Sequence, residues 1–242
     1  RFSFSSRGQL QDDVHMDVEA TLIKRIGMET AGRMHTCRSR NDQVVLDSKL
    51  YARKRQLELR QRTLDMVEAF LERAEPLTAK VMPSYTHFQH AQPVSVAFWL
   101  SHYAAVFLRD VERLKNTYQI TDLNPLGAGA IAATSFPIDR ELTTRLMGFQ
   151  RVHVHSMDAT SARDFMLDSL HCSSSIAVTL SRLAEELIMW SSYEFQTTAM
   201  DDGFAMGSSM MPQKKNPGVL ELVRGRMGRI LGYLTGGFTM VK

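Results

Sequence analysis

Residues 42–75 read DQVVLDSKLYARKRQLELRQRTLDMVEAFLERAE and contain neither glycine nor proline until Pro76. Leucines recur in this stretch every seven residues, at Leu50, Leu57, Leu64 and Leu71. A helix of about 30 residues would run roughly 45 Å, and Pro76 closes it because proline does not continue a helix. We expect the leucine stripe to lie in the core. On a helix this long, a seven-residue repeat also indicates packing between subunits.

Three further segments have helical spacing of their apolar residues, and strand signals are scarce. One begins at Pro93, with Val96, Leu100, Tyr103, Phe107, Val111 and Leu114 on one face. Another covers roughly residues 162–195, with Ile176, Leu180, Leu183, Leu187 and Trp190. The last begins at Pro217, with Leu220, Val223, Met227, Ile230 and Leu234. The pattern predicts an all-α fold, an elongated bundle of long helices with crossover connections.

Composition and charge exclude several classes of protein. The chain has 242 residues, 44% hydrophobic and 23% charged, as is ordinary for globular proteins. A formal net charge of +3 is too small to indicate a nucleic-acid partner. The most apolar long stretch, residues 94–108, is interrupted by Ser95, Ser101 and His102, so we expect no membrane partner.

The two cysteines, Cys37 and Cys172, lie far apart and match neither a metal-binding spacing nor a disulfide framework. This usage fits a reducing compartment, and we expect a cytoplasmic location. The first residues lack the apolar core of a signal peptide. Because the sequence does not begin with Met, we expect a fragment or a processed form.

Residues 207–217, GSSMMPQKKNP, form the most distinctive polar stretch. Glycine lets backbone N–H groups turn toward an anion, and Lys214 and Lys215 add positive charge, so the loop suits a carboxylate or a phosphate. The spacings of a Walker loop and of a nucleophile elbow are both absent. The stretch is equally open to a structural interpretation, with Asn216 as helix N-cap, Pro217 as first helical residue and solvated lysines.

Two other polar clusters each come just before a long helix. The first is HTCRSRNDQ, residues 35–43, whose arginines could hold carboxylates near a helix N-terminus. It could also be only a well-capped helix start, with Ser39 or Asn41 as the cap. The second is YTHFQHAQP, residues 85–93. Its histidines, His87 and His90, are as single residues more often structural than catalytic.

Taken together, these three strings resemble the signature motifs of the fumarase, aspartase and argininosuccinate lyase superfamily, in the same order. RSRNDQ and the ending QKKNP are most similar to the argininosuccinate lyase and delta-crystallin branch. The resemblance runs from about Asp12 to the last residue and includes NPLGAGAIA, FPIDRE and SMDATSARDF. It implies β-elimination that splits argininosuccinate into arginine and fumarate, a reaction that requires a base, an acid and stabilisation of a carbanion-like intermediate.

The resemblance also implies roles for individual residues. Ser208 matches the base, His87 the acid, and Lys214 the cation that stabilises charge on the substrate carboxylate. Glu221 matches the carboxylate partner of the histidine, although an i,i+3 pair with Arg224 is the structural alternative. The substrate-binding positions of the family match Asn41, Thr86 and Asn216, and we expect their neighbours Ser39 and Arg40 to contribute to binding. The chemistry implies no cofactor, and the sequence has no metal-ligand pattern.

Members of this family assemble as homotetramers in which three subunits contribute to each active site, so we expect D2 symmetry here. We expect residues 1–40 to be the remnant of an N-terminal domain with the first substrate loop. Residues 41–242 are then the central helical-bundle domain, and the C-terminal domain is absent.

The chain departs from the family pattern near the site, at His155, Ala162, Ala205 and Met206. These positions concern substrate fit and loop motion rather than the type of reaction. Two alternatives stay open at the level of sequence. One is a non-catalytic structural protein of the delta-crystallin kind, and the other is a sister lyase acting on adenylosuccinate, fumarate or aspartate.

Overall fold

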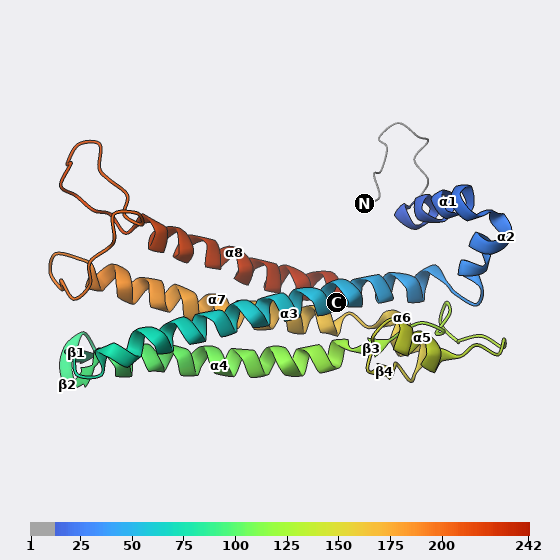
Figure 1. The fold of residues 1–242 in the computed structure, drawn as a ribbon, viewed down its shortest axis with the longest axis horizontal. Coiled ribbons are helices and arrows are strands. Elements are labelled where there is room, and N and C mark those ends of the chain that lie inside the picture. The colour runs from blue at the N-terminus through green and yellow to red at the C-terminus, as the bar shows by residue number, and fades with distance from the viewer. Residues whose placement is uncertain (1–12) are drawn as a thin grey trace. The chain divides into compact units, whose positions relative to one another are not determined.

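The computed structural model describes residues 13–242, and most of this span is helical (Figure 1). The predicted all-α class is confirmed, with two small two-stranded sheets added. In chain order the elements are α1 (Val14–Ile26), α2 (Met28–Ala31), η1 (Gly32–His35), α3 (Arg40–Ala74), η2 (Glu75–Leu77), β1 (Val81–Thr86), β2 (Gln89–Ser95), α4 (Val96–Thr121), β3 (Leu123–Asn124), α5 (Arg140–Leu146), β4 (Arg151–Val152), α6 (Ser156–Ser161), α7 (Asp164–Trp190) and α8 (Gly218–Val241).

The chain forms two compact units, and α3 begins in one and continues into the other. The first unit consists, in its described part, of residues 13–47 and 123–161. Its helix α1 has no buried residue. Polar contacts hold it instead: Asp13 pairs with Arg40 at 3.1 Å, and Glu19 Oε2 lies 2.7 Å from His35 Nε2. The α1 helix is therefore attached within this unit mainly by charge and hydrogen bonds.

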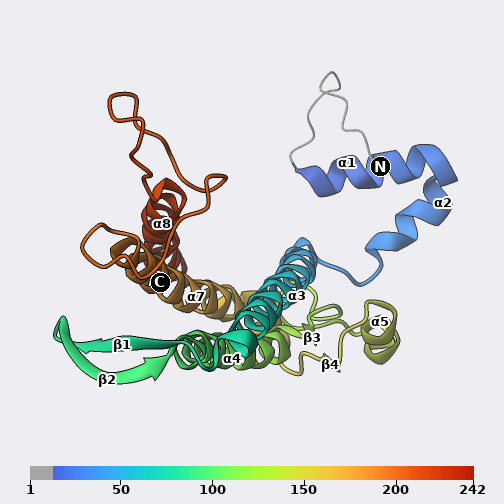
Figure 2. The ribbon, with the colours of Figure 1, turned by 60° about the vertical axis from the view of Figure 1, so that its left-hand side comes forward.

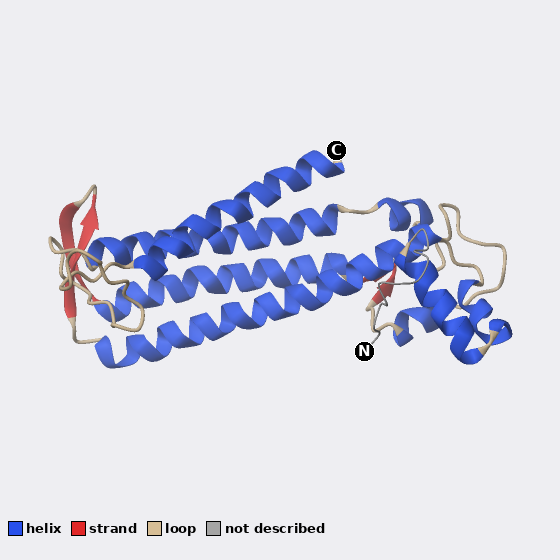
Figure 3. Cartoon of the chain, turned by 90° about the horizontal axis from the view of Figure 1, so that it is seen from above, coloured by secondary structure: helices blue, strands red, loops and turns tan. Residues whose placement is uncertain are grey.

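The second unit, residues 48–122 and 162–242, is a bundle in which α4, α7, α8 and most of α3 lie side by side (Figure 3). Its largest apolar cluster joins three of these helices. The buried members are Val67 from α3, Tyr103, Ala104, Phe107 and Leu114 from α4, and Cys172, Ile176 and Leu183 from α7. The stripes expected on the helices after Pro93 and residue 162 supply most of this cluster.

The expectation that the leucine stripe of α3 lies in the core is wrong for the single chain. None of the four leucines is buried, and Leu57 and Leu71 are each 48% exposed. The buried side of α3 is mixed: Val45, Leu46, Ala52, Val67 and Ala74 lie there together with the almost fully covered polar residues Lys49, Gln56 and Thr63. Gln56 Nε2 donates to Thr121 Oγ1 and Ser169 Oγ at 2.9 and 2.8 Å, which satisfies its buried amide.

A β-hairpin precedes α4, where the sequence predicted a helix from Pro93 (Figure 2). Pro93 lies in β2 opposite Pro83 of β1, and α4 begins three residues later, with Ser95 Oγ accepting from the Phe98 N–H. Proline is tolerated in this short two-stranded sheet because its strands have free edges. The hairpin turns through His87 and Phe88, between the paired residues Thr86 and Gln89.

Candidate active site

The hydroxyl of Ser208 is held by its own loop. Its Oγ accepts hydrogen bonds from the backbone N–H groups of Met210 at 3.3 Å and Met211 at 3.1 Å. Two N–H donors aimed at one oxygen stabilise negative charge there more than they stabilise a neutral hydroxyl. The loop therefore places two N–H donors where they would stabilise an anionic Ser208 oxygen.

The base of this loop is closed by backbone pairing between Met206 and Asn216, with N···O distances of 2.8 and 2.9 Å. Gly218, the first residue of α8, lies against Met206. A Cβ added there would stand 2.0 Å from the Met206 Sδ, so the close approach requires glycine while methionine occupies position 206. Met206, a departure from the family pattern, is thus part of how this loop closes.

The two adjacent lysines have different surroundings. Lys215 forms an ion pair with Asp202, whose hydrogen bond and charge raise the pKa of the ammonium group. Lys214 is exposed and has no ion-pair partner among residues 13–242. The unpaired cation is the one that the family resemblance matches to charge stabilisation.

A cavity of about 850 Å³ lies beside the loop and brings together three of the predicted site residues, Lys214, Asn216 and Glu221. Glu221 lies in the first turn of α8. Its structural alternative, pairing with Arg224, is not formed, because Arg224 pairs with Glu185 of α7. The opposite wall carries hydroxyl groups that the sequence analysis did not single out, on Ser191, Ser192, Thr197 and Thr198.

Thr86 and His87 lie at the tip of the hairpin, at the same end of the bundle as the signature loop (Figure 1). Both are exposed. His87 does not line the 850 Å³ cavity, and within the described part of this chain it makes no hydrogen bond to Glu221. One chain therefore does not unite the two residues that the resemblance pairs.

Ser39, Arg40 and Asn41 belong to the first unit, where each has a partner. Ser39 Oγ accepts from the Asn41 N–H at 3.2 Å, as expected of a cap, and Asn41 Nδ2 donates to the Ala130 carbonyl at 3.0 Å. Arg40 contacts Asp13, and it donates to Gln43 Oε1 at 2.7 Å. All three side chains thus help to fix the start of α3.

Asp42 is the residue of this motif whose importance the sequence analysis missed. It is fully buried, and its carboxylate accepts from the N–H groups of Ser39, Gly127 and Gly129 at 3.1, 3.2 and 2.9 Å. Burial raises the pKa of Asp42, opposed by these hydrogen bonds. The sequence signal that could have indicated this role is the glycine pair in LGAGA, Gly127 and Gly129. Backbone N–H groups in a buried turn need an acceptor, and Asp42 supplies it.

Neighbouring Arg38 differs from Arg40. Its Nε and Nη2 have no hydrogen-bond partner among the described residues, and burial lowers the pKa of its guanidinium group. In the same span, residues 13–242, no group of His, Cys, Asp and Glu side chains is arranged to hold a metal ion. No helix in that span is both long and apolar enough to cross a membrane.

Comparisons with known proteins agree with this architecture. A family model described as Lyase matches residues 8–232. The argininosuccinate lyase of Limosilactobacillus fermentum is 48% identical over 96% of this chain and 50% of its own length. The argininosuccinate lyase of Anoxybacillus flavithermus is 47% identical over 98% of this chain and 53% of its own length. The chain thus spans about half the length of these relatives.

Among solved structures, an EDDS lyase in complex with formate superposes with a TM-score of 0.89 at 33% identity, covering 94% of this chain and 46% of that one. With a family model that matches nearly all of its residues, this chain belongs to the lyase family.

Proposed function

We propose that the protein to which this chain belongs cleaves argininosuccinate into arginine and fumarate. The observation that carries the proposal is 48% identity to an argininosuccinate lyase across 96% of the chain, with all three polar motifs present. The signature loop supports the same chemistry, because its serine is surrounded by N–H donors and its free lysine faces a cavity.

In this reaction Ser208, as its alkoxide, removes the proton from the carbon next to a substrate carboxylate. The electron pair left behind is delocalised onto that carboxylate, where Lys214 offsets the second negative charge. The pair then forms the double bond of fumarate as the bond from the neighbouring carbon to the guanidinium nitrogen breaks. His87 donates a proton to the departing nitrogen, and arginine leaves. Glu221 orients the imidazole and favours its protonated form.

The remaining predicted residues bind substrate in this proposal. Asn216 lines the same cavity as Lys214. Thr86 adjoins His87 on the hairpin, and Ser39, Arg40 and Asn41 present hydroxyl, guanidinium and amide groups at the start of α3. We propose that these groups meet in a homotetramer, with each site built from three subunits. The exposed leucines of α3 and the distribution of the three motifs over two units support that arrangement.

Two further parts of the proposal concern context. Residues 41–242 act as the central helical-bundle domain, and residues 1–40 as the end of a preceding domain that brings in the first substrate loop. A cytoplasmic location is supported by two free cysteines, one of them buried, which suit a reducing compartment.

The two lysines offer a matched test in the full-length protein, with fumarate release followed by ultraviolet absorbance. Lys214→Met should lower kcat by about 10²-fold or more, because it removes the cation opposite the developing charge. Lys215→Met removes the same charge one residue away and should change kcat by less than about tenfold, since Lys215 is engaged by Asp202. Equal losses in both variants would remove Lys214 from its assigned role.

Ser208→Ala tests the base. Turnover should be abolished while the sedimentation profile stays unchanged, because within residues 13–242 the hydrogen bonds of the Ser208 side chain stay inside its own loop. Rates close to normal would exclude Ser208 as the base. A panel of argininosuccinate, adenylosuccinate, fumarate and aspartate then decides the substrate, and a full-length protein that turns over none of them is a structural protein instead.

A further inference from the structure

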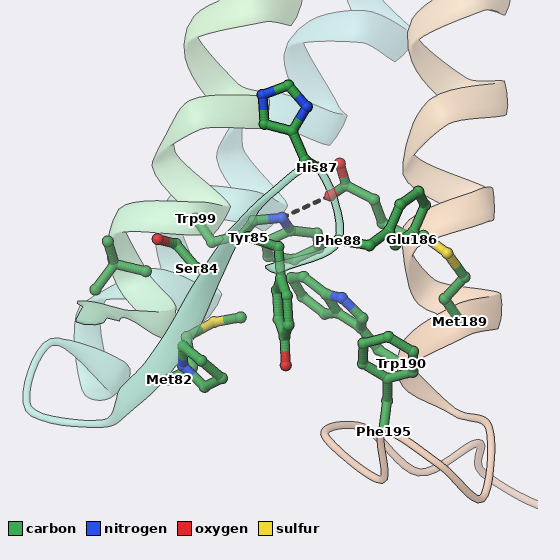
Figure 4. A pocket seen from close by; sticks show the side chains of 12 residues that line it. Met82, Ser84, Tyr85, His87, Phe88, Trp99, Glu186, Met189, Trp190 and Phe195 are labelled. Atoms are coloured by element: carbon green, nitrogen blue, oxygen red, sulfur yellow. Dashed lines mark hydrogen bonds between the residues drawn. The ribbon is translucent and has the colours of Figure 1, made fainter. Parts of the chain in front are cut away.

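A second cavity, of about 370 Å³, lies beneath the hairpin and shares no lining residue with the cavity beside the signature loop. Its walls come from β1, the hairpin tip, α4, α7 and the segment after α7 (Figure 4). Five aromatic side chains and one carboxylate dominate the lining: Tyr85, Phe88, Trp99, Trp190, Phe195 and Glu186. The volume is sufficient for a small organic molecule.

The aromatic rings are arranged at angles to one another rather than stacked flat. Trp99 and Trp190 have centroids 4.4 Å apart and planes at 48°. Tyr85 and Phe195 meet edge to face, 5.6 Å apart at 67°. Rings that meet at such angles cannot all cover one another's faces, so some face area is left toward the cavity. Aromatic faces carry the negative end of the ring quadrupole, which attracts cations.

Glu186 adds a formal negative charge to this wall. Its Oε2 accepts a hydrogen bond from Trp99 Nε1 at 2.7 Å, which fixes the carboxylate among the rings. Within residues 13–242, neither Glu186 nor Arg182, one helical turn away, forms a salt bridge. The pKa of Tyr103, next to Glu186, is raised first by burial and then by the Glu186 charge. The Glu186 carboxylate is therefore half-buried without a paired cation. Partial burial of an unpaired charge is unfavourable, and a bound cation would offset that cost.

We propose that this cavity binds an organic cation, a guanidinium or alkylammonium group, between its aromatic faces and the Glu186 carboxylate. His87 also lines this cavity, but its ring points away from the other side chains (Figure 4), so a bound cation need not displace it. The proposal assigns no step of the proposed reaction to this cavity, because the binding depends on the aromatic walls and the charge of Glu186. A neutral apolar ligand would use the same rings but would gain nothing from that charge.

Tryptophan fluorescence reports on this cavity directly, because Trp99 and Trp190 are the only two tryptophans of the chain and both line it. The chain is titrated with arginine, with tetramethylammonium and with citrulline, which has nearly the shape of arginine but an uncharged urea group. Both cations should give saturable changes, with citrulline at least about tenfold weaker than arginine, the ratio expected when one cation–π and charge contact is lost. Equal affinity for arginine and citrulline, or no saturable change, would overturn the proposal.

Glu186→Gln removes the charge and keeps an acceptor for Trp99 Nε1. It should weaken arginine binding at least about tenfold and leave the residual affinity of citrulline unchanged. Glu194→Gln is the matched control, since Glu194 is an exposed glutamate nearby that lines neither cavity. Far-ultraviolet circular dichroism checks that each variant is folded. Equal arginine affinity in Glu186→Gln and Glu194→Gln would refute the role of Glu186, and the wild-type comparison of arginine with citrulline stands without any variant.

Discussion

Asp42 illustrates how a short polar motif serves two purposes at the level of single residues. Its neighbours Ser39, Arg40 and Asn41 are the proposed substrate-binding groups, and Asp42 holds the backbone that carries them. It does so from a fully buried position through Gly127 and Gly129, more than 80 residues along the chain. A carboxylate is suited to this position because it can accept on two oxygens at once.

Replacing Asp42 by Asn should lower the free energy of unfolding by about 1–3 kcal/mol, because the amide nitrogen faces an N–H donor that loses its acceptor. Urea unfolding followed by circular dichroism measures this loss. Asp47→Asn, an exposed carboxylate on the same helix, should cost less than about 1 kcal/mol. A loss at Asp42 no larger than at Asp47 would show that the buried hydrogen bonds contribute little.

The two thiols should differ in reactivity. Cys172 is 2% exposed, and burial raises the pKa of its thiol, whereas Cys37 is half-buried. At pH 8, Ellman's reagent should therefore modify Cys37 in the folded chain and Cys172 only after unfolding. Since the folded state holds the proton of Cys172 more tightly, its contribution to stability falls as pH rises above about 8.5. Rapid labelling of two thiols in the folded protein would contradict this.

Residue types alone identified the polar motifs, and the preference for Lys214 over Lys215 came from the family resemblance. The structure adds a physical difference between the two lysines, because only Lys215 pairs with Asp202. Arg38 and Arg40 differ in a similar way, because the acceptors of Arg40 include Asp13, the N-cap of α1. Such distinctions depend on which distant side chain reaches the site, and local patterns contain no information on that.

At the level of elements, the hairpin before α4 carries backbone strain. His87 and Phe88 have φ angles of 54° and 58°, both in the left-handed region. A two-residue turn with both φ values positive is the pattern that favours Asn-Gly. His-Phe adopts it at a cost of about 1–2 kcal/mol per residue. Strain of this kind is often associated with functional sites, and here it presents the imidazole of the proposed acid.

Phe88→Gly should relieve part of this strain and raise the free energy of unfolding by about 1 kcal/mol, because glycine adopts positive φ without a steric penalty. Phe88 is 70% exposed, so little apolar burial is lost. Phe98 is similarly exposed but helical, and Phe98→Gly should be destabilising by about 0.5–1 kcal/mol. Thermal unfolding distinguishes the two, and destabilisation in both variants would argue against strain at Phe88.

The long helices were predictable, and the hairpin was not, for physical reasons. Helical spacing over α4, α7 and α8 repeats for many turns, and the predicted starts lie within a few residues of those observed. The hairpin strands contain Pro83, Pro93 and several polar residues, so they lack the alternation that marks a strand. The two strands of the hairpin are held by backbone hydrogen bonds, and the pattern of side chains gives almost no information about such bonds.

At the scale of the whole molecule, the single chain exposes much apolar surface in its second unit. Leu57 and Leu71 of α3 are half exposed, and so are several residues of α8, among them Leu222, Tyr233 and Phe238. Added Cβ atoms at Gly225, Gly228, Gly232 and Gly236 of α8 would meet nothing within 4 Å. The sequence indicated a repeat on α3 and left both a core face and a subunit contact open, because periodicity alone does not separate a buried apolar face from an exposed one.

Leu57→Ala and Leu71→Ala should weaken assembly, seen as a smaller sedimenting species, while each chain keeps its helical circular dichroism signal. Phe107→Ala is the contrasting variant, because Phe107 is fully buried inside one chain. It should lower the free energy of unfolding by about 3–5 kcal/mol through the cavity it leaves. An unchanged sedimentation profile for the leucine variants would show that this face is not a subunit contact.

The exposed leucines of α3 have a consequence for heat resistance. Val45, Leu46 and Val67 of α3 are buried within its own chain, but Leu57 and Leu71 are each 48% exposed and gain only part of their possible hydrophobic stabilisation there. In the proposed assembly the rest of that gain comes from neighbouring copies, so it is subject to mass action. Dilution should then lower the melting temperature even when buffer and pH are held constant. The highest temperature at which the protein stays folded would therefore depend on its concentration.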